Sequence, residues 1–276
     1  MSVVAIINRK GGSGKSTLAT HLAAHCSHAG SRVLLGDADP QHSSLAWLQR
    51  RAKQELARGA PIAGQAVSNG ALLRPSAGIT HVVLDTPGGL RGFDLARTVV
   101  YAHAVILPVC NSAFDRESAA ECFAELHTLP RVASGRCKVA AVGMRLDSRT
   151  KASVELPAWA EKNGIPYIGA LREAQVYVRN VEQGLTLFDH APDKVAADLL
   201  QWRPILDWLH ATWQAAAQAD LAARAAVRPA DLPGVRDLPG QVQTGPRVRE
   251  TAASVPKRRD PAGPLGWLLG TLRPGL

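Results

Sequence analysis

The sequence predicts an α/β fold with a mostly parallel, twisted sheet and helices on both of its faces. Short apolar runs of strand length alternate with amphipathic stretches of helical length, which is the pattern of repeated strand–helix–strand units. The short runs are apolar throughout, as is typical of parallel strands covered on both faces. The chain has 276 residues, of which 46% are hydrophobic, and this composition excludes wholesale disorder.

The expected elements follow one another along the chain. Strands are expected at residues 2–8, 32–35, 79–84, 104–109 and 138–143, and helices at 15–29, 43–57, 90–102, 114–128 and 150–163. Residues 189–214 are expected to form one or two closing helices, interrupted at Pro204 because proline lacks an amide hydrogen and clashes with the preceding turn. His21 and His25 lie one turn apart on the first helix, and we interpret them as surface residues.

The composition changes near residue 220. Residues 221–276 contain 8 Pro and 7 Gly, and they carry five of the nine excess positive charges. We therefore expect one globular domain over residues 1–215 and a Pro/Gly/Arg-rich, disordered tail over 216–276. The net charge of +9 indicates a polyanionic partner, either nucleic acid or an acidic membrane surface.

The sequence argues against a membrane-spanning protein and against a protein built on a zinc site or on disulfides. No segment approaches the roughly 20 consecutive apolar residues of a membrane-spanning helix, and the first residues do not resemble a signal peptide. The four cysteines show no CxxC pairing, which argues against a zinc site or a disulfide framework. Free thiols and the missing leader together predict a cytoplasmic protein.

A glycine-rich turn connects the first strand to the first helix. Residues 9–17 read Arg-Lys-Gly-Gly-Ser-Gly-Lys-Ser-Thr, and this strand–loop–helix context is that of a phosphate-binding loop. Glycines allow backbone amides to surround phosphate oxygens, Lys15 can reach the β- and γ-phosphates, and the Ser16 hydroxyl can bind Mg²⁺. The loop predicts ATP and Mg²⁺ as ligands of a P-loop NTPase fold. Its candidate nucleotide-binding residues are Gly11, Gly12, Ser13, Gly14, Lys15, Ser16 and Thr17.

The loop differs from an ordinary P-loop in having Lys10 directly after the strand segment. This form resembles the deviant Walker A motif of the ParA/MinD family of ATPases. The resemblance implies that Lys10 is a signature lysine, which reaches the nucleotide of the partner subunit in an ATP-sandwich dimer. A positive charge placed there would stabilise negative charge on the transferring phosphoryl group.

Two aspartate segments fit the same family. Residues 37–41, Asp-Ala-Asp-Pro-Gln, resemble a switch in which Asp39 orients the attacking water and Asp37 supports the Mg²⁺ network. The apolar run ending in Asp85 resembles a Walker B strand, whose aspartate holds Mg²⁺ through water, and residues 86–89 resemble a second switch. Carboxylates at strand ends beside a phosphate loop are suited to hold a hydrated metal.

The resemblance extends over about residues 2–210. Residues 106–109 and 111–115 look like the strand and loop at the edge of the adenine pocket, and Met144 and Arg145 occupy positions that contact adenine in the family. Residues 175–179, with Gly184 and Phe188, are most similar to the small ParF-type partition ATPases. With no winged-helix segment before the loop, the chain is not expected to be a repressor-type ParA.

The resemblance to this family implies a slow, partner-stimulated ATPase that acts in plasmid partition, chromosome segregation or cargo positioning. The implied partners are a second copy in an ATP-bound homodimer, DNA bound without sequence preference, and a ParB-like or cargo adaptor protein. The implied location is the cytoplasm, at the nucleoid. The candidate DNA-binding residues are Arg145, Arg149, Lys151, Arg172, Arg179 and Lys194.

Two other readings of the sequence stay open. A MinD-like, membrane-associated positioning ATPase would carry a basic amphipathic helix at its C-terminus, and the Gly and Pro residues between Gly263 and Gly275 oppose such a helix. A metabolic enzyme of the same fold, such as dethiobiotin synthetase or a nitrogenase-type iron protein, is the second. The iron protein requires cluster cysteines, a pattern that Cys110, Cys122 and Cys137 do not show.

Overall fold

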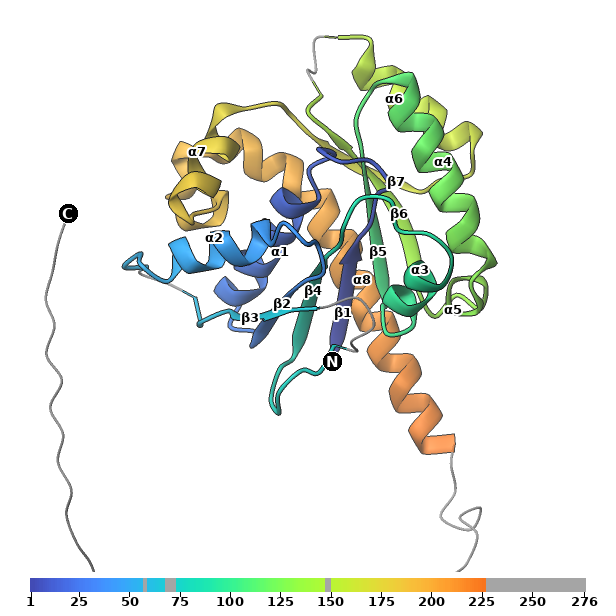
Figure 1. Ribbon diagram of the computed structural model, residues 1–276, viewed down its shortest axis with the longest axis horizontal. Helices are drawn as coiled ribbons and strands as arrows, with labels where there is room; N and C mark the ends of the chain where they lie inside the picture. The colour runs from blue at the N-terminus through green and yellow to red at the C-terminus, as the bar shows by residue number, and fades with distance from the viewer. Residues whose placement is uncertain (57–58, 68–72, 147–149, 227–276) are drawn as a thin grey trace, which may run out of the picture. The chain divides into compact units, whose positions relative to one another are not determined.

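The computed structural model describes residues 1–56, 59–67, 73–146 and 150–226. Seven parallel strands form one sheet in the order β3-β2-β4-β1-β5-β6-β7 (Figure 1). The strands are β1 Ser2–Ile6, β2 Val33–Asp37, β3 Ala63–Ala66, β4 His81–Asp85, β5 Ala104–Val109, β6 Lys138–Met144 and β7 Tyr167–Leu171. The predicted parallel α/β architecture is confirmed.

Helices connect the strands and cover both faces of the sheet. They are α1 Lys15–His28, α2 Ser43–Arg51, α3 Gly92–Val99, α4 Ala113–Thr128, α5 Pro130–Ala133, α6 Ala152–Lys162, α7 Gln175–Gln183 and α8 Ala196–Ala226, with the short 3-10 turns η1 Leu187–Asp189 and η2 Pro192–Lys194. Residues of α3, α4, α5 and α6 join one buried apolar cluster, and residues of α1, α2, α7 and α8 join the other. Figure 1 shows α4 and α6 on one side of the sheet, with α1, α2 and α7 on the other.

The sequence does not predict two of the strands, β3 and β7. The edge strand β3 reads Ala-Gly-Gln-Ala and is largely exposed, so it has no apolar run. Strand β7 contains Gly169, and its first four residues are only half-buried. Edge strands bury little side-chain area, so the tertiary pairing with β2 and β6 decides their conformation.

The interpretation of the α1 histidines as surface residues is wrong. His21 is fully buried, and its ring stacks on Trp202 with centroids 5.4 Å apart, whereas His25 is half-buried against Phe188. Burial lowers the pKa of each of these histidines to about 4, so both are neutral at pH 7. The sequence does not reveal this environment because α8 and η1, which cover α1, are remote along the chain.

The expected interruption at Pro204 is also wrong, because α8 continues through this residue. The Pro204 ring lies against Gly169 of β7, where an added Cβ would meet its Cγ at 3.3 Å. On either side, Trp202 and Ile205 are fully buried against the sheet. Packing of α8 on the sheet therefore offsets the hydrogen bond that proline removes. The helix continues to Ala226, beyond residue 215, and residues 227–276 lie outside the described part.

Candidate functional site

The phosphate loop lies between the end of β1 and the start of α1, near the carboxyl ends of the central strands. Gly12 and Gly14 have φ values of +74° and +92°, which side chains with a Cβ rarely adopt. Gly14 also lies under Met144, whose Cε is 2.6 Å from the position an added Cβ would take. The backbone conformation therefore requires glycine at position 14, and a larger residue would also displace the end of the Met144 side chain.

A cavity of about 610 Å³ lies along this loop. It brings together the predicted phosphate-binding residues, Asp39 and the loop that follows β4. Its lining consists of Gly11, Gly12, Ser13, Gly14, Lys15, Ser16, Thr17, Asp39, Pro40, Gln41, Ser43, Pro87, Gly88 and Arg145. Three separate segments that the sequence assigned to one site thus meet around one space of nucleotide-binding size.

Lys15 is buried at the base of this loop. Its Nζ donates to the Lys10 carbonyl oxygen at 3.0 Å. Burial lowers the pKa of Lys15, and the carboxylates of Asp85 and Asp39 oppose that shift. An ammonium group held by a loop carbonyl is available to exchange that carbonyl for a phosphate oxygen.

Asp37 and Asp85 lie at equivalent positions at the ends of the neighbouring strands β2 and β4, and both are fully buried. The Asp37 carboxylate accepts hydrogen bonds from the backbone N–H groups of Asp39, Ser44 and Leu45 at 3.0–3.1 Å. The N–H groups of Ser44 and Leu45 lie in the first turn of α2, where backbone N–H groups have no carbonyl partner within the helix. Asp37 therefore fastens α2, and the segment that carries Asp39, to the end of the sheet.

Only one of the two Asp85 carboxylate oxygens has a hydrogen-bond donor in the described structure. Its Oδ2 accepts a 2.6 Å hydrogen bond from the Ser44 hydroxyl, whereas its buried Oδ1 has no hydrogen-bond partner in the described structure. Burial raises the pKa of Asp85 to about 6, although the Ser16 and Ser44 hydroxyls and Lys15 counteract the shift. An unpartnered buried carboxylate oxygen close to Ser16 is a donor set that fits Mg²⁺, a hard cation that prefers oxygen ligands.

The loop after β4 packs on the phosphate loop. The Thr86 hydroxyl donates to the Ile6 carbonyl at 2.7 Å, which ties the start of this loop to β1. A Cβ at Gly88 would lie 3.3 Å from the carbonyl oxygen of Arg9 and 3.5 Å from the amide nitrogen of Gly11. The backbones of the two loops are therefore in close contact, with little room for a side chain at position 88.

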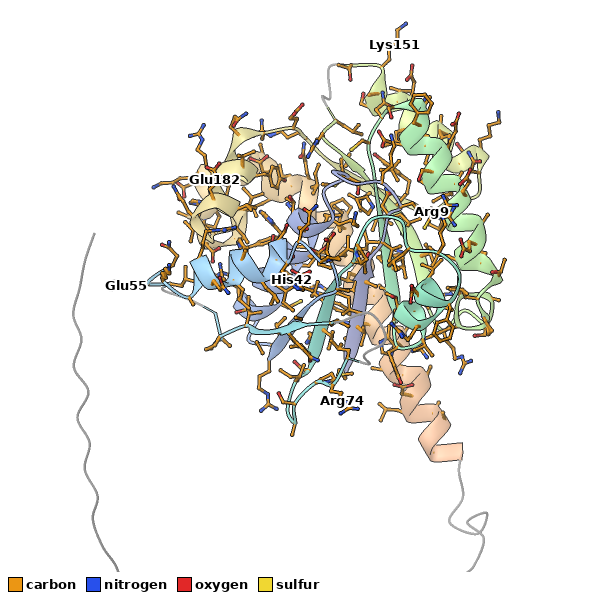
Figure 2. All side chains as sticks on the ribbon, in the orientation of Figure 1. Arg9, His42, Glu55, Arg74, Lys151 and Glu182 are labelled. Carbon is orange, nitrogen blue, oxygen red and sulfur yellow. The ribbon has the colours of Figure 1, made fainter. Side chains whose placement is uncertain are left out.

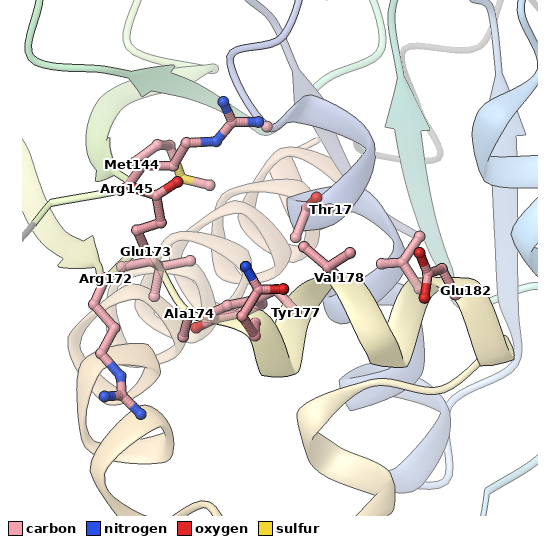
Figure 3. A pocket seen from close by; sticks show the side chains of 13 residues that line it. Thr17, Met144, Arg145, Arg172, Glu173, Ala174, Tyr177, Val178 and Glu182 are labelled. Carbon is pink, nitrogen blue, oxygen red and sulfur yellow. The ribbon is translucent and has the colours of Figure 1, made fainter.

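A second cavity of about 490 Å³ adjoins the first through Gly14, Thr17 and Arg145, which line both. Figure 3 shows Met144 and Arg145 on one side of it and Val178 of α7 on the other. The rest of its lining comes from the end of β7, from α7 and from the loop between them: Leu171, Arg172, Glu173, Ala174, Gln175, Tyr177, Val178, Val181 and Glu182. The two adenine candidates, Met144 and Arg145, thus lie beside the phosphate loop. Arg145 has a φ of +55°, unusual for a residue with a side chain.

The sequence did not indicate that β7 and α7 would line this second cavity. In Figure 3 the Arg172 side chain points away from the cavity. The loop at residues 111–115, expected at the adenine edge, lines neither of these two cavities and instead contacts Lys10. Leu171 and Ala174 supply apolar surface of the kind a base requires, but nothing in their spacing marks it.

The two residues before the glycines are bound to α4. Arg9 pairs with Glu121 at 3.1 Å and with Glu125, and its position beside α4 is visible in Figure 2. Glu125 also accepts a hydrogen bond of 2.6 Å from the Gly92 N–H at the start of α3. Lys10 pairs with Asp115 at 3.2 Å. Helix α4 therefore connects the phosphate loop to the segment that follows β4.

The candidate DNA-binding residues do not share one environment. Arg145 lines the two cavities, and Arg172 forms a two-pronged ion pair with Asp198 at 2.7 and 2.9 Å. Lys151 projects from the start of α6 in Figure 2, and Arg179 and Lys194 are exposed. Arg149 lies outside the described residues.

All four cysteines are free thiols; Cys26, Cys122 and Cys137 are buried, whereas Cys110 is partly exposed. Burial raises the pKa of each of these three thiols to about 11 or 12, so none is a thiolate at neutral pH. Among the helices of the described residues, none has both the length and the apolar character needed to cross a membrane.

Comparisons with known proteins agree with the geometry. The model of the CobQ/CobB/MinD/ParA nucleotide binding domain matches residues 4–206. The "maintenance of carboxysome distribution protein A" of Gloeobacter kilaueensis is 32% identical over 217 residues, which cover 77% of this chain and 95% of that protein. The protein of the same name from Halothiobacillus neapolitanus is 27% identical over 200 residues, covering 71% of this chain and 91% of that protein.

Among solved structures, a variant of Cyanothece McdA in complex with ATP superimposes with a TM-score of 0.59. It is 16% identical, and the match covers 74% of this chain and 96% of that chain, which shows a common fold. The family match spans the phosphate loop, both aspartate segments and both cavities. The chain therefore belongs to the CobQ/CobB/MinD/ParA nucleotide-binding family and is a protein of the ParA/MinD ATPase type.

Proposed function

We propose that this chain hydrolyses ATP slowly, dimerises around two bound ATP molecules, and uses this cycle to position DNA or another large cargo. The observation that carries the proposal is the convergence of the phosphate loop, Asp39 and the loop after β4 on one cavity, with the open Asp85 oxygen buried at the end of β4. The similarity to two carboxysome-distribution proteins supports a positioning role over a metabolic one.

The residues of the site have distinct roles in this proposal. The loop amides and Lys15 bind the phosphates, and the Ser16 hydroxyl and Asp85 Oδ1 would hold Mg²⁺, which neutralises phosphate charge when bound. Asp39 orients the attacking water, and its Oδ1 is fixed by the Gln41 N–H at 2.9 Å. Asp37 supports this metal and water network through α2 and Ser44, which it holds in place.

The second cavity is the proposed adenine pocket. Leu171, Ala174 and Val178 offer apolar contacts to a flat base, and Met144 and Arg145 face them beside the phosphate loop. Lys10 is proposed to reach the nucleotide of the partner subunit in the dimer. Its side chain is 41% exposed, so it is accessible to a second copy of the chain.

Three variants separate these roles in one experiment. Dimerisation is measured by light scattering during size-exclusion chromatography with Mg²⁺ and ATP, and nucleotide binding by calorimetry. Lys15→Ala is expected to lose binding, Lys10→Ala to keep binding but lose the dimer, and Asp39→Ala to accumulate an ATP-bound dimer. A dimer that forms equally well without nucleotide, or with Lys10→Ala, would refute the sandwich arrangement.

DNA binding by the dimer, without sequence preference, is proposed for the exposed residues Lys151, Arg179 and Lys194. Affinity for a fluorescent duplex is expected to fall steeply with salt, because binding releases counterions from phosphates. The same preparation is sedimented with anionic vesicles. Binding to vesicles but not to DNA would identify a MinD-like membrane-associated protein instead. Stimulation of hydrolysis by a partner would be assayed with the products of neighbouring genes.

A further inference from the structure

Lys10 is held by its own subunit through two contacts that both come from the start of α4. Its Nζ lies 3.2 Å from Asp115 Oδ1 and 5.6 Å from the centroid of the Phe114 ring. The first contact is an ion pair and the second a cation–π contact, so both attract the ammonium to the same place. Phe114 is 73% exposed, which puts these contacts at the surface of the molecule.

The backbone at Lys10 contributes to this arrangement. The Lys10 N–H donates to Asn8 Oδ1 at 2.8 Å, and Asn8 is itself anchored to the Pro108 carbonyl. The starting point of the lysine side chain is thereby fixed, and only its own torsions can move the ammonium. The contacts at the end of the side chain therefore decide whether it lies on its own subunit or extends toward another.

Asp115 is well placed to retain the ammonium. It lies in the first turn of α4, where its N–H bonds the Ser112 hydroxyl at 3.1 Å and its Oδ2 accepts from the same hydroxyl. The other oxygen, Oδ1, is the one that contacts Lys10. The Asp115 side chain is 16% exposed, so the pair is partly shielded from water and weakened less by salt than a fully exposed pair.

We propose that Asp115 is a positioning residue that latches Lys10 onto its own subunit, so that the ion pair must break before the ATP-bound dimer forms. This inference rests on the proposed role of Lys10 across the dimer. The latch opposes dimerisation and so raises the concentration of ATP at which the dimer appears. It thereby limits dimer formation when little or no ATP is bound to the protein.

The test uses the full chain with Mg²⁺ and a non-hydrolysable ATP analogue, so that hydrolysis does not reverse dimerisation. Asp115→Asn keeps the size of the side chain and an acceptor for Ser112 while removing the charge. It is expected to lower the analogue concentration for half-maximal dimerisation by about two- to five-fold, the range for a single partly exposed ion pair. Asp115→Glu should remain close to the unaltered chain, and Glu117→Gln, an exposed acid of the same helix, is the matched control.

A second readout follows the latch in the monomer itself. Without nucleotide, Lys10 is labelled with an amine-acylating reagent and quantified by mass spectrometry. Asp115→Asn should increase labelling of Lys10 but not of Lys53, which is remote in sequence and exposed. Thermal unfolding of each variant shows whether the loss of the negative charge of Asp115, in the first turn of α4, has disturbed that helix.

The possible outcomes are distinct. Unchanged labelling of Lys10, or a dimerisation threshold that stays the same or rises in Asp115→Asn, overturns the latch. Because Lys10→Ala is expected to lose the dimer, adding Asp115→Asn to it should not restore dimerisation, and a double variant that dimerises also overturns the latch. Failure of the unaltered chain to dimerise with ATP refutes the proposed function. A dimer that depends on Lys10 but not on Asp115 refutes the latch alone.

Discussion

The Ser44 hydroxyl donates a hydrogen bond of 2.6 Å to Asp85 Oδ2, and this contact joins the first turn of α2 to the end of β4. The same Ser44 uses its backbone N–H to bind Asp37 at the end of β2. One residue therefore connects the two aspartates that the sequence placed at the metal site. The buried carboxylates are held at a defined separation by a helix terminus rather than by each other.

Ser44→Ala is expected to destabilise the chain by about 1–3 kcal/mol, because Asp85 would keep a buried oxygen without its donor. The loss of this hydrogen bond should also raise the pKa of Asp85 further above its usual range. Chemical denaturation gives the stability, and Mg²⁺ titration of the ATP complex gives the metal affinity, which should fall. A Ser43→Ala variant, at the neighbouring and exposed position, is the control for the stability effect.

Asp85→Asn is expected to separate stability from metal binding. The folded-state pKa of about 6 lies above the ordinary carboxyl value of 3.8, so ionisation of Asp85 weakens the folded state as pH rises from about 4 to 6. Removing the charge should leave the nucleotide-free protein as stable at pH 7, or more stable by up to about 2 kcal/mol. Marked destabilisation of Asp85→Asn at pH 7 would contradict this expectation, because it would show that neighbouring groups stabilise the ionised Asp85 carboxylate in the folded protein.

Binding of Mg²⁺ needs the ionised form of Asp85, so the apparent affinity for Mg²⁺ in the ATP complex should fall below about pH 6. In Asp85→Asn this fall should be smaller, because no proton competes at position 85 and only protonation of the ATP phosphates remains, and Mg²⁺-dependent hydrolysis should be lost. Calorimetric titrations between pH 5 and pH 8 measure both effects. A fall of the same size in the variant would assign the pH dependence to another group.

Gly14→Ala is expected to lose nucleotide binding and to cost about 1–3 kcal/mol of stability, because φ is +92° and the new Cβ would overlap the Met144 side chain. Gly11→Ala is the comparison variant, since space around Gly11 is open and its φ is not positive. Adding Met144→Ala should relieve only the overlap, so that stability recovers in part. Full recovery would mean that the backbone conformation itself costs nothing.

Asp189 forms a buried ionic cluster with Arg51 at 2.8 Å and His28 at 2.7 Å. Burial alone would raise the pKa of Asp189, but the hydrogen bonds from Arg51, His28 and Thr186 outweigh it and lower the pKa well below its usual range. The resulting stabilisation is present above the unfolded-state pKa of about 4 and is lost as pH falls below it.

Asp189→Asn should therefore cost about 3 kcal/mol at pH 7, since Arg51 is left buried without its counter-charge. Denaturation at pH 7 and at pH 3 measures the difference, which should shrink at the lower pH. Equal destabilisation at both pH values would show that Asp189 acts through packing rather than charge. Asp207→Asn, an exposed acid of α8, is a suitable control.

The parallel α/β fold and the phosphate part of the site could be predicted from the sequence because their signals are local. A central strand buries both faces and so reads as a continuous apolar run, as β1 and β5 do. A phosphate loop needs glycine, lysine and serine at fixed offsets within one turn, so the loop at residues 9–17 is recognisable without any tertiary contact.

Tertiary structure alone decided the features that join distant segments. The second cavity is assembled from β6, β7 and α7, the burial of His21 depends on α8, and the continuity of α8 at Pro204 depends on its packing near Gly169. Lys10 and Asp115 are brought together across more than a hundred residues. The sequence by itself determined which chemical groups the protein has for binding a nucleotide. Only the packing of the helices on the sheet decided which of those groups are buried, which are paired and which remain open to a ligand, because burial and pairing arise from contacts between remote parts of the chain.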